Sequence, residues 1–304
     1  MLSLGNRLSL PTSSNSAGGL LLDKFGEGVA RAYSLRRLTS AYSGYALKMR
    51  RSGTNEEADV SFDGSGEISL AGSKVYNASG STADGTTLGA WIGSANGFAK
   101  VWYDQSGLGY NLTQSTNNNF QPKLINSGAI LTTNGKASLD FDGTDDLFPF
   151  DETGLNLADI STFTVIKHDA FNATTKIAWV ASFDINNYYM LLVNNSEHEF
   201  YYSDDFEVSY NAISNNQFLV TNIAGPILGV ATQFQDGVQG NGTNPLDVSN
   251  LTDSADNGMP FFFKDLRDNS YIIFRGYVSG LSDSITSQRL NGFGSAIQRI
   301  KESL

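Results

Sequence analysis

The segment VWYDQSG, residues 101–107, holds the residue types best suited to bind a sugar. An indole ring covers the apolar face of a sugar ring, and a carboxylate and an amide beside it bond the hydroxyl groups. Trp102, Asp104 and Gln105 supply all three within this segment. The same residues also suit a structural corner, because Asp and Gln side chains bond backbone groups where a strand ends. The sequence leaves both interpretations open.

Two further aromatic residues extend the set of candidates. Trp91 lies in residues 72–97, where Gly, Ser, Thr and Ala are frequent, and this composition predicts a long surface loop. Tyr202 stands beside acidic residues in YYSDDFE, residues 201–207. The alternative is that such aromatic residues belong to the core. The predicted glycan-binding residues are Trp91, Trp102, Asp104, Gln105 and Tyr202.

An acidic cluster follows in LDFDGTDD, residues 139–146. Asp142, Asp145 and Asp146 join Asp140 in this short stretch, and clustered oxygen ligands suit Ca²⁺. The spacing is not that of an EF-hand loop, because the terminal Glu is missing. The alternative to a calcium site is a strand that leads into an Asp-Gly turn. We predict no other metal and no cofactor.

The two histidines, His168 and His198, each have an acidic neighbour in the sequence. Neither belongs to an HExxH or GxSxG motif, so the sequence assigns them no catalytic role. Basic residues concentrate at Arg36, Arg37, Lys48, Arg50 and Arg51. Such a concentration suits either contact with an acidic neighbour or the solvated face of paired strands.

Strands are expected to position all of these residues. Of the 304 residues, 40% are hydrophobic, 17% are charged and 31 are Gly, which favours many short strands and turns in one large domain. The predicted strands recur about every ten residues, which is typical of an antiparallel β-sandwich or jelly roll. They are residues 29–38, 45–51, 58–62, 68–70, 99–103, 137–141, 161–168, 177–183, 188–193, 197–202, 217–223, 227–234, 259–264 and 271–281.

The predicted sandwich domain spans residues 20–304, ends in a helix and is preceded by an arm. Residues 284–302 have apolar side chains at helical spacing behind Ser284, and they predict a short terminal helix. Residues 1–19 form an arm in which leucines alternate with polar residues up to Pro11. A Ser/Gly-rich linker follows. The arm suits either a disordered segment or an anchor that adds a strand to a neighbouring subunit.

Composition excludes several classes of function. The formal net charge of −11 disfavours binding to nucleic acid, because phosphate backbones are repelled. The chain has no Cys, so it contains neither a disulfide nor a thiolate ligand. No stretch has the apolar length of a membrane span, and we expect neither membrane insertion nor a signal peptide.

Three phrases carry a resemblance to a known module: YSLRRLTSAYSGYALKMRRS at 33–52, FAKVWYDQSGLGYNLTQS at 98–115 and QPKLINSGAILTTNGKASLDFDGTDDL at 121–147. They resemble a module of tailed-phage and marine bacterial surface proteins. The module is similar to the concanavalin A-like sandwich that forms the catalytic domain of α-L-arabinofuranosidase B, and to laminin-G-like lectin domains. The resemblance implies an all-β, concanavalin-like fold.

The resemblance implies a function at a virion surface, as a head decoration, fibre or tail-associated adhesin in a homo-oligomer. Its ligand would be a cell-surface polysaccharide, and the sandwich would bind or decorate. The alternatives are a free-standing lectin and a glycoside hydrolase of the arabinofuranosidase type, which needs two carboxylates. The cysteines of that family, including its vicinal pair, are absent here. We therefore assign no catalytic residue.

Overall fold

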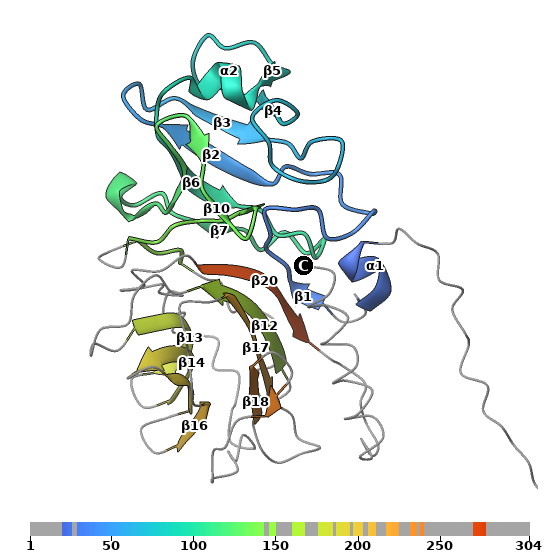
Figure 1. Ribbon diagram of the computed structural model, residues 1–304, viewed down its shortest axis with the longest axis vertical. Coiled ribbons are helices and arrows are strands. Elements are labelled where there is room, and N and C mark those ends of the chain that lie inside the picture. The colour runs from blue at the N-terminus through green and yellow to red at the C-terminus, as the bar shows by residue number, and fades with distance from the viewer. Residues whose placement is uncertain are drawn as a thin grey trace, which may run out of the picture.

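The computed structural model describes residues 20–25, 29–142, 146–149, 160–167, 176–184, 187–194, 197–202, 206–210, 217–224, 232–235, 238–239 and 270–277. From residue 176 onward only the backbone of the strands is described. In these residues the chain is an antiparallel β-sandwich, as predicted, with curled sheets and few helical turns (Figure 1). The arm and the predicted terminal helix lie outside the described residues.

An eight-stranded sheet occupies the upper part of Figure 1 and carries the resembling phrases. Its strands run in the order β5-β4-β3-β2-β6-β8-β9, and β7 pairs with β6 beside β8. The strands are β2 (Leu47–Arg51), β3 (Glu57–Val60), β4 (Lys74–Tyr76), β5 (Thr86–Thr87), β6 (Gly97–Trp102), β7 (Leu112–Thr113), β8 (Lys123–Asn126) and β9 (Ala129–Ile130). A separate hairpin pairs β10 (Thr132–Thr133) with β11 (Lys136–Ala137).

Two more sheets occupy the lower part of Figure 1. The six-stranded sheet has the order β1-β20-β12-β17-β18-β19, and the four-stranded sheet has the order β13-β14-β15-β16. The strands of the former are β1 (Val29–Arg31), β12 (Ile160–Lys167), β17 (Gln217–Ala224), β18 (Thr232–Gln235), β19 (Val238–Gln239) and β20 (Ser270–Tyr277). Those of the latter are β13 (Lys176–Asp184), β14 (Asn187–Asn194), β15 (Glu197–Tyr202) and β16 (Phe206–Tyr210).

The core side of the eight-stranded sheet follows from strand alternation. Leu47 and Met49 in β2, and Ala58 and Val60 in β3, are fully buried, while the residues between them turn to the other face. Short helical turns complete the scaffold, namely α1 (Leu21–Phe25), α2 (Leu88–Ile92) and the 3₁₀ turn η1 (Asn118–Phe120). Within the described part of the chain, no helix has the length and apolarity to cross a bilayer.

Most predicted strands are present, with ends shifted by a few residues. The predictions at 45–51, 58–62, 99–103, 161–168, 177–183, 188–193, 197–202, 217–223 and 271–281 are confirmed as β2, β3, β6, β12, β13, β14, β15, β17 and β20. The strand predicted at 227–234 corresponds to β18 at its end. The strand predicted at 259–264 lies outside the described residues.

Four predictions were wrong within the described residues. The strand predicted at 29–38 ends at Arg31, and residues 68–70 form no strand. Residues 137–141 keep only the end of β11 and one isolated bridge from Lys123 to Asp140. Residues 72–97 are not a simple surface loop, because they contain β4, β5 and α2.

Candidate functional site

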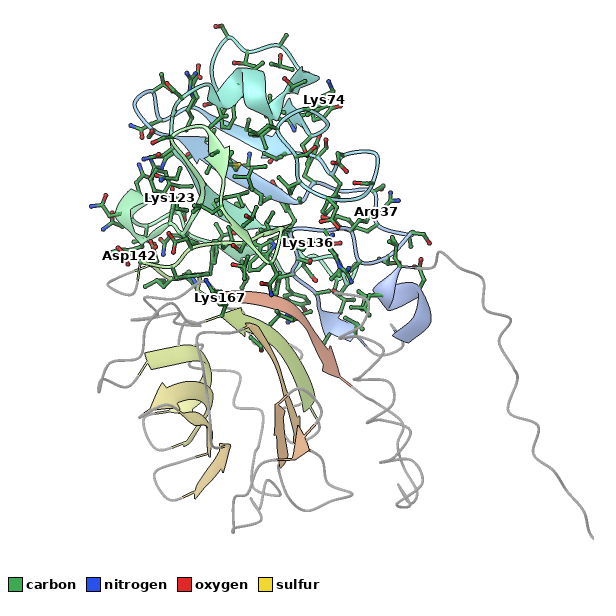
Figure 2. The ribbon with its side chains drawn as sticks, viewed as in Figure 1. Arg37, Lys74, Lys123, Lys136, Asp142 and Lys167 are labelled. Atoms are coloured by element: carbon green, nitrogen blue, oxygen red, sulfur yellow. The ribbon has the colours of Figure 1, made fainter. Side chains whose placement is uncertain are left out.

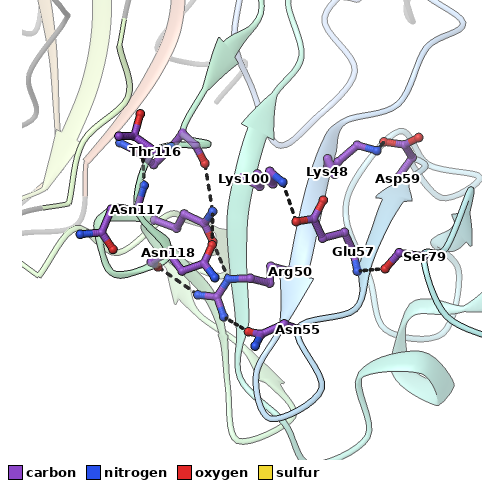
Figure 3. Close-up of polar contacts among 12 residues, drawn as sticks. Lys48, Arg50, Asn55, Glu57, Asp59, Ser79, Lys100, Thr116, Asn117 and Asn118 are labelled. Carbon is purple, nitrogen blue, oxygen red and sulfur yellow. Dashed lines mark hydrogen bonds and ion pairs between the residues drawn. The ribbon is translucent and has the colours of Figure 1, made fainter.

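The solvent-facing side of β2, β3, β4 and β6 gathers aromatic and charged side chains. Figure 3 shows the charged residues of this surface. Directly opposed positions of neighbouring strands point to the same face. Lys48 of β2 is opposite Asp59 of β3, which in turn is opposite Tyr76 of β4. The alternation that buries the core residues of these strands therefore presents their polar partners to solvent.

Five half-buried rings form a continuous band on this surface, which we call the aromatic strip. Its members are Tyr42, Tyr45, Phe62, Tyr76 and Tyr103. The ring of Tyr45 lies 5.6 Å from that of Tyr76 and 6.3 Å from that of Tyr103. Tyr42 contacts Phe62 edge-on at 6.4 Å and donates its hydroxyl to the carbonyl of Tyr45 at 2.8 Å. The strip thus offers several partly exposed ring faces side by side.

Asp59 holds one end of the aromatic strip in place. This buried carboxylate accepts a 2.6 Å bond from the Tyr103 hydroxyl and a 2.8 Å bond from the Asn77 amide. It also lies 3.3 Å from the Lys48 ammonium. Burial raises the pKa of the Tyr103 hydroxyl above its ordinary value, and the bond to Asp59 raises it further. Tyr103 therefore stays a neutral donor at physiological pH.

Three cations on this surface, Lys48, Arg51 and Lys100, are neutralised locally. Lys100 is paired with Glu57, Lys48 with Asp59, and Arg51 with Glu56 at 3.5 Å. Arg50 is buried and donates to Asn55, to Gln121 and to the carbonyl of Asn118 (Figure 3). Lys48, Arg50 and Arg51, three of the five residues in the basic concentration noted in the sequence, are therefore engaged in separate contacts.

Asp104 and Gln105 form a structural corner, one of the two alternatives that the sequence left open. Asp104 accepts backbone bonds from Ala32 at 2.8 Å, from Ser106 at 2.9 Å and from Tyr110 at 3.2 Å. Gln105 accepts from the amide of Leu38 at 2.8 Å. Its own amide donates to the carbonyls of Ser34 and Arg36, each at 3.0 Å. Residues 32–38 bond to these side chains in place of a neighbouring strand.

The two tryptophans predicted to bind glycans lie in the interior. Trp102 has no exposed surface and contacts the rings of Tyr33 and Phe148. Trp91 is 2% exposed on α2, a helical turn that Thr87 caps by accepting from the amide of Ala90. Asp104 and Gln105 are also buried. The structure thus corrects the expectation for these four residues, because buried side chains with interior partners present no face to a sugar.

None of the remaining predicted site residues is among the described members of the aromatic strip. Tyr202 ends β15, opposite Tyr189 of β14 and Phe206 of β16, and only its backbone is described. His198 lies on the same strand, whereas His168 and Asp145 lie outside the described residues. The backbone amide of Asp142 donates to the Asp146 carboxylate at 2.9 Å. Such a bond is typical of a local turn. A calcium site there remains a hypothesis.

Sequence reasoning missed most of the aromatic strip. Tyr103 was expected on the face of its strand opposite Trp102, and the structure confirms this alternation. Tyr42, Tyr45, Phe62 and Tyr76 stand at strand ends and in turns, where no regular period marks them. The available signal was the run SAYSGY before β2, which places two tyrosines in a Gly- and Ser-rich turn. Among the described residues, no group of three His, Asp or Glu side chains is arranged to hold a metal ion.

Comparison with known proteins identifies the fold. No protein-family model and no curated protein sequence matches the chain. Among solved structures, an arabinofuranosidase complexed with arabinofuranosyl-α-1,2-xylobiose aligns with 92% of the chain at a TM-score of 0.61 and 15% identity. A GH54 α-L-arabinofuranosidase soaked with a cyclic sulfate inhibitor aligns with 92% of it at a TM-score of 0.57 and 14% identity.

The chain shares the fold of these arabinofuranosidases. The similarity to the arabinofuranosidase sandwich, stated above from three sequence phrases, is therefore confirmed at the level of fold. The chain spans 64% of the length of the first of these enzymes and 65% of the second. At such identities the likeness concerns architecture alone, since one fold supports many functions.

Proposed function

We propose that this chain is a surface protein of a tailed-phage virion whose β-sandwich binds carbohydrate at the aromatic strip. The observation that carries the proposal is the set of half-exposed rings around Asp59 on one face of a rigid sheet. Ring faces stack on sugar rings, and the surrounding carboxylate, amide and hydroxyl groups suit sugar hydroxyls. The fold shared with enzymes that act on arabinose-containing glycans is consistent with such a ligand.

The ligand is a neutral polysaccharide. Lys48 and Lys100 are each paired with a carboxylate, so the two cations nearest Asp59 do not select an anionic sugar. In a chain of net charge −11, an acidic polysaccharide would also be repelled over a distance of several ångströms. The pentose-containing ligand of the neighbouring arabinofuranosidase makes arabinan and arabinoxylan the first polymers to test.

Affinity gels or glycan arrays with neutral and acidic polysaccharides test the sugar site. Tyr45→Ala and Tyr76→Ala should each weaken binding about fivefold, because one stacking contact contributes on the order of 1 kcal/mol. Ser94→Ala, which truncates an exposed turn residue outside the aromatic strip, is the control and should leave binding unchanged. If both Tyr variants bind as the wild type does, the sugar site does not lie at the aromatic strip. If the wild type binds none of the polymers, the proposal is overturned.

The virion assignment is supported by the three phage-like phrases and by the alternating leucines of residues 1–19. An arm of that pattern adds a strand to a neighbour through main-chain bonds and buries its leucine face. Many copies on a particle would also turn weak single sites into firm attachment. Mass spectrometry of purified virions should detect the chain. Deletion of residues 1–19 should leave a folded sandwich that no longer joins the particle.

The second candidate function is a glycoside hydrolase of arabinofuranosidase type. The alignment of 92% of the chain with such an enzyme favours it. Incubation with arabinan, arabinoxylan and host polysaccharide separates the two functions. Sustained sugar release that one Asp or Glu substitution abolishes would establish the hydrolase and overturn the binding-only proposal.

A further inference from the structure

Leu108 is the one large hydrophobic residue that is exposed among the described residues, with 59% of its surface accessible. It sits at the tip of a loop between two glycines, Gly107 and Gly109, which both adopt positive φ angles. Positive φ is a conformation that glycine adopts without strain, so the sequence itself turns Leu108 outward. Covering an apolar side chain displayed in this way removes its surface from water, which favours association.

The loop that displays Leu108 is held rigidly from below. The Ser106 hydroxyl donates to Asp104 at 2.6 Å and accepts from the amide of Leu108 at 3.2 Å. The amide of Tyr110 donates to the same carboxylate. Asp104 is itself buried and bonded to residue 32. Leu108 therefore stands on a preorganised support, and little conformational entropy is lost when a partner covers it.

An open groove of about 430 Å³ lies elsewhere on the described surface, between the segment 67–71 and the strands β9 to β11. Its exposed lining is mainly apolar, although Glu67, Ser69, Thr132 and Lys136 also contribute, and it contains no aromatic residue. The groove is therefore better suited to an aliphatic side chain than to a stacked sugar. The lining includes Ile68, Leu70, Ala71, Ile130 and Ala137. Lys136, labelled in Figure 2, closes the rim by pairing with Glu67 at 3.0 Å.

Charge favours contact between these two features. Residues 105–122 around Leu108 contain no Asp, Glu, Lys or Arg, and neither do residues 68–73 and 124–135 around the groove. The charges at the groove rim, Glu67 and Lys136, cancel each other. Two copies of a chain with net charge −11 approach with least repulsion through surfaces of this kind.

We propose that copies of this chain associate head to tail, with Leu108 of one copy seated in the groove of the next. The contact is heterologous, because a knob meets a different surface, and it propagates into rings or rows instead of stopping at a dimer. One leucine is a small interface core, so the pairwise affinity is low, and repeated copies on an assembly make the contact effective. The proposal does not depend on the sugar site.

Sedimentation velocity of the full chain over a rising concentration series tests the contact. Leu108→Asp and Ala71→Glu should each weaken self-association on the order of tenfold or more, because each places an unpaired charge in the apolar contact. Ala90→Glu adds the same charge at an exposed alanine on α2 and should associate like the wild type. Thr132→Glu is a second groove variant, to be used if Ala71→Glu fails to fold by circular dichroism.

Mixing the two variants gives the sharper result. Leu108→Asp keeps an intact groove and Ala71→Glu keeps an intact knob, so an equimolar mixture should form a heterodimer that stops at two copies. A wild type that stays monomeric throughout the series would overturn the proposal. So would variants that associate as the wild type does, or a mixture that does not form the heterodimer.

Discussion

The two sides of strand β6 use similar residue types for opposite purposes. On the core side, Trp102 is fully buried and the adjoining Asp104 bonds only to nearby groups of the chain. On the solvent side, Tyr103 is half exposed and bonds to Asp59, the buried carboxylate beneath the aromatic strip. The neighbours in one short phrase, WYD, thus divide between scaffold and candidate site.

The difference shows that hydrogen-bond partners separate structural from functional polar residues better than residue type does. A carboxylate whose oxygens face backbone amides fixes the path of the chain. Asp59 instead accepts from three side chains of three strand regions, and thereby sets the geometry of an exposed surface. The same test assigns Gln105 to the scaffold, since its side chain bonds to the amide of Leu38 and to the carbonyls of Ser34 and Arg36.

Asp104→Ala should have the largest effect on the core side. The change leaves the buried amide of Ala32 without its acceptor and also removes bonds to Ser106 and Tyr110. We expect a loss of about 3 kcal/mol in the free energy of unfolding, measured by urea denaturation. Asp84→Ala is the control, because the exposed Asp84 accepts one backbone bond from Asn77, and it should cost well under half as much. Equal losses would contradict the structural role of the corner.

Gly97→Ala should have the next largest effect on stability. A Cβ on Gly97 would collide with the end of Met49 and approach the Cβ of Ile125 at 3.2 Å, within the buried side of the sheet. Overpacking of this kind costs about 1–3 kcal/mol. Gly64→Ala, in an exposed turn with no atom within 4 Å of the added methyl, should change stability by less than about 0.5 kcal/mol. Thermal melting of the two variants measures the difference. Equal melting temperatures would contradict the tight packing at Gly97.

The strands of the fold could be predicted because their signals are local. Alternation over a few residues and turns rich in Asn, Asp and Gly locate β2, β6, β12 and β17 to within a few residues. The prediction that the strand continues through residues 32–38 was wrong because of long-range contacts. Its apolar residues suggested a continued strand, but its backbone bonds go to Asp104 and Gln105, about seventy positions away in the sequence.

The candidate site was much harder to predict for the same reason. Tyr45, Tyr76 and Tyr103 come from three separate segments, and only the strand order β4-β3-β2-β6 brings them together. A single-sequence reading favours residues adjacent in the chain, such as Trp102, Asp104 and Gln105. The exposure of Trp91 was predicted wrongly for a related reason. Its Gly- and Ser-rich surroundings suggested a surface loop, whereas the helical turn α2 buries the ring.

Tyr103→Phe and Tyr33→Phe compare the two sides directly. Each removes a hydroxyl that donates a 2.6 Å bond, from Tyr103 to Asp59 and from the buried Tyr33 to the carbonyl of Tyr110. Both should lose about 1 kcal/mol of stability. Tyr103→Phe should also weaken carbohydrate binding about two- to threefold, because Asp59 and the rings around it shift, with about 0.5 kcal/mol at stake. If Tyr33→Phe weakens carbohydrate binding and Tyr103→Phe does not, the sugar site does not lie at the aromatic strip.

Alkaline titration should give the smallest effect on stability, and it tests how deeply the tyrosine hydroxyls of the aromatic strip are buried. Burial raises the pKa of Tyr42 to about 12, with a further contribution from the Asp104 carboxylate, and it raises the pKa of Tyr103 as well. In the unfolded chain both would ionise near their ordinary pKa of 10.0. The folded state therefore holds more protons above that pH, so stability is intact below pH 10 and falls as pH rises toward the folded values.

Tyrosinate absorbance followed during the titration should show two late groups, and urea midpoints should decline over the same interval. Tyr42→Phe and Tyr103→Phe should each make the slope of unfolding free energy against pH shallower by up to one proton. A slope that neither substitution changes would mean that both hydroxyls are freely solvated, and that the strip is looser than its ring contacts indicate.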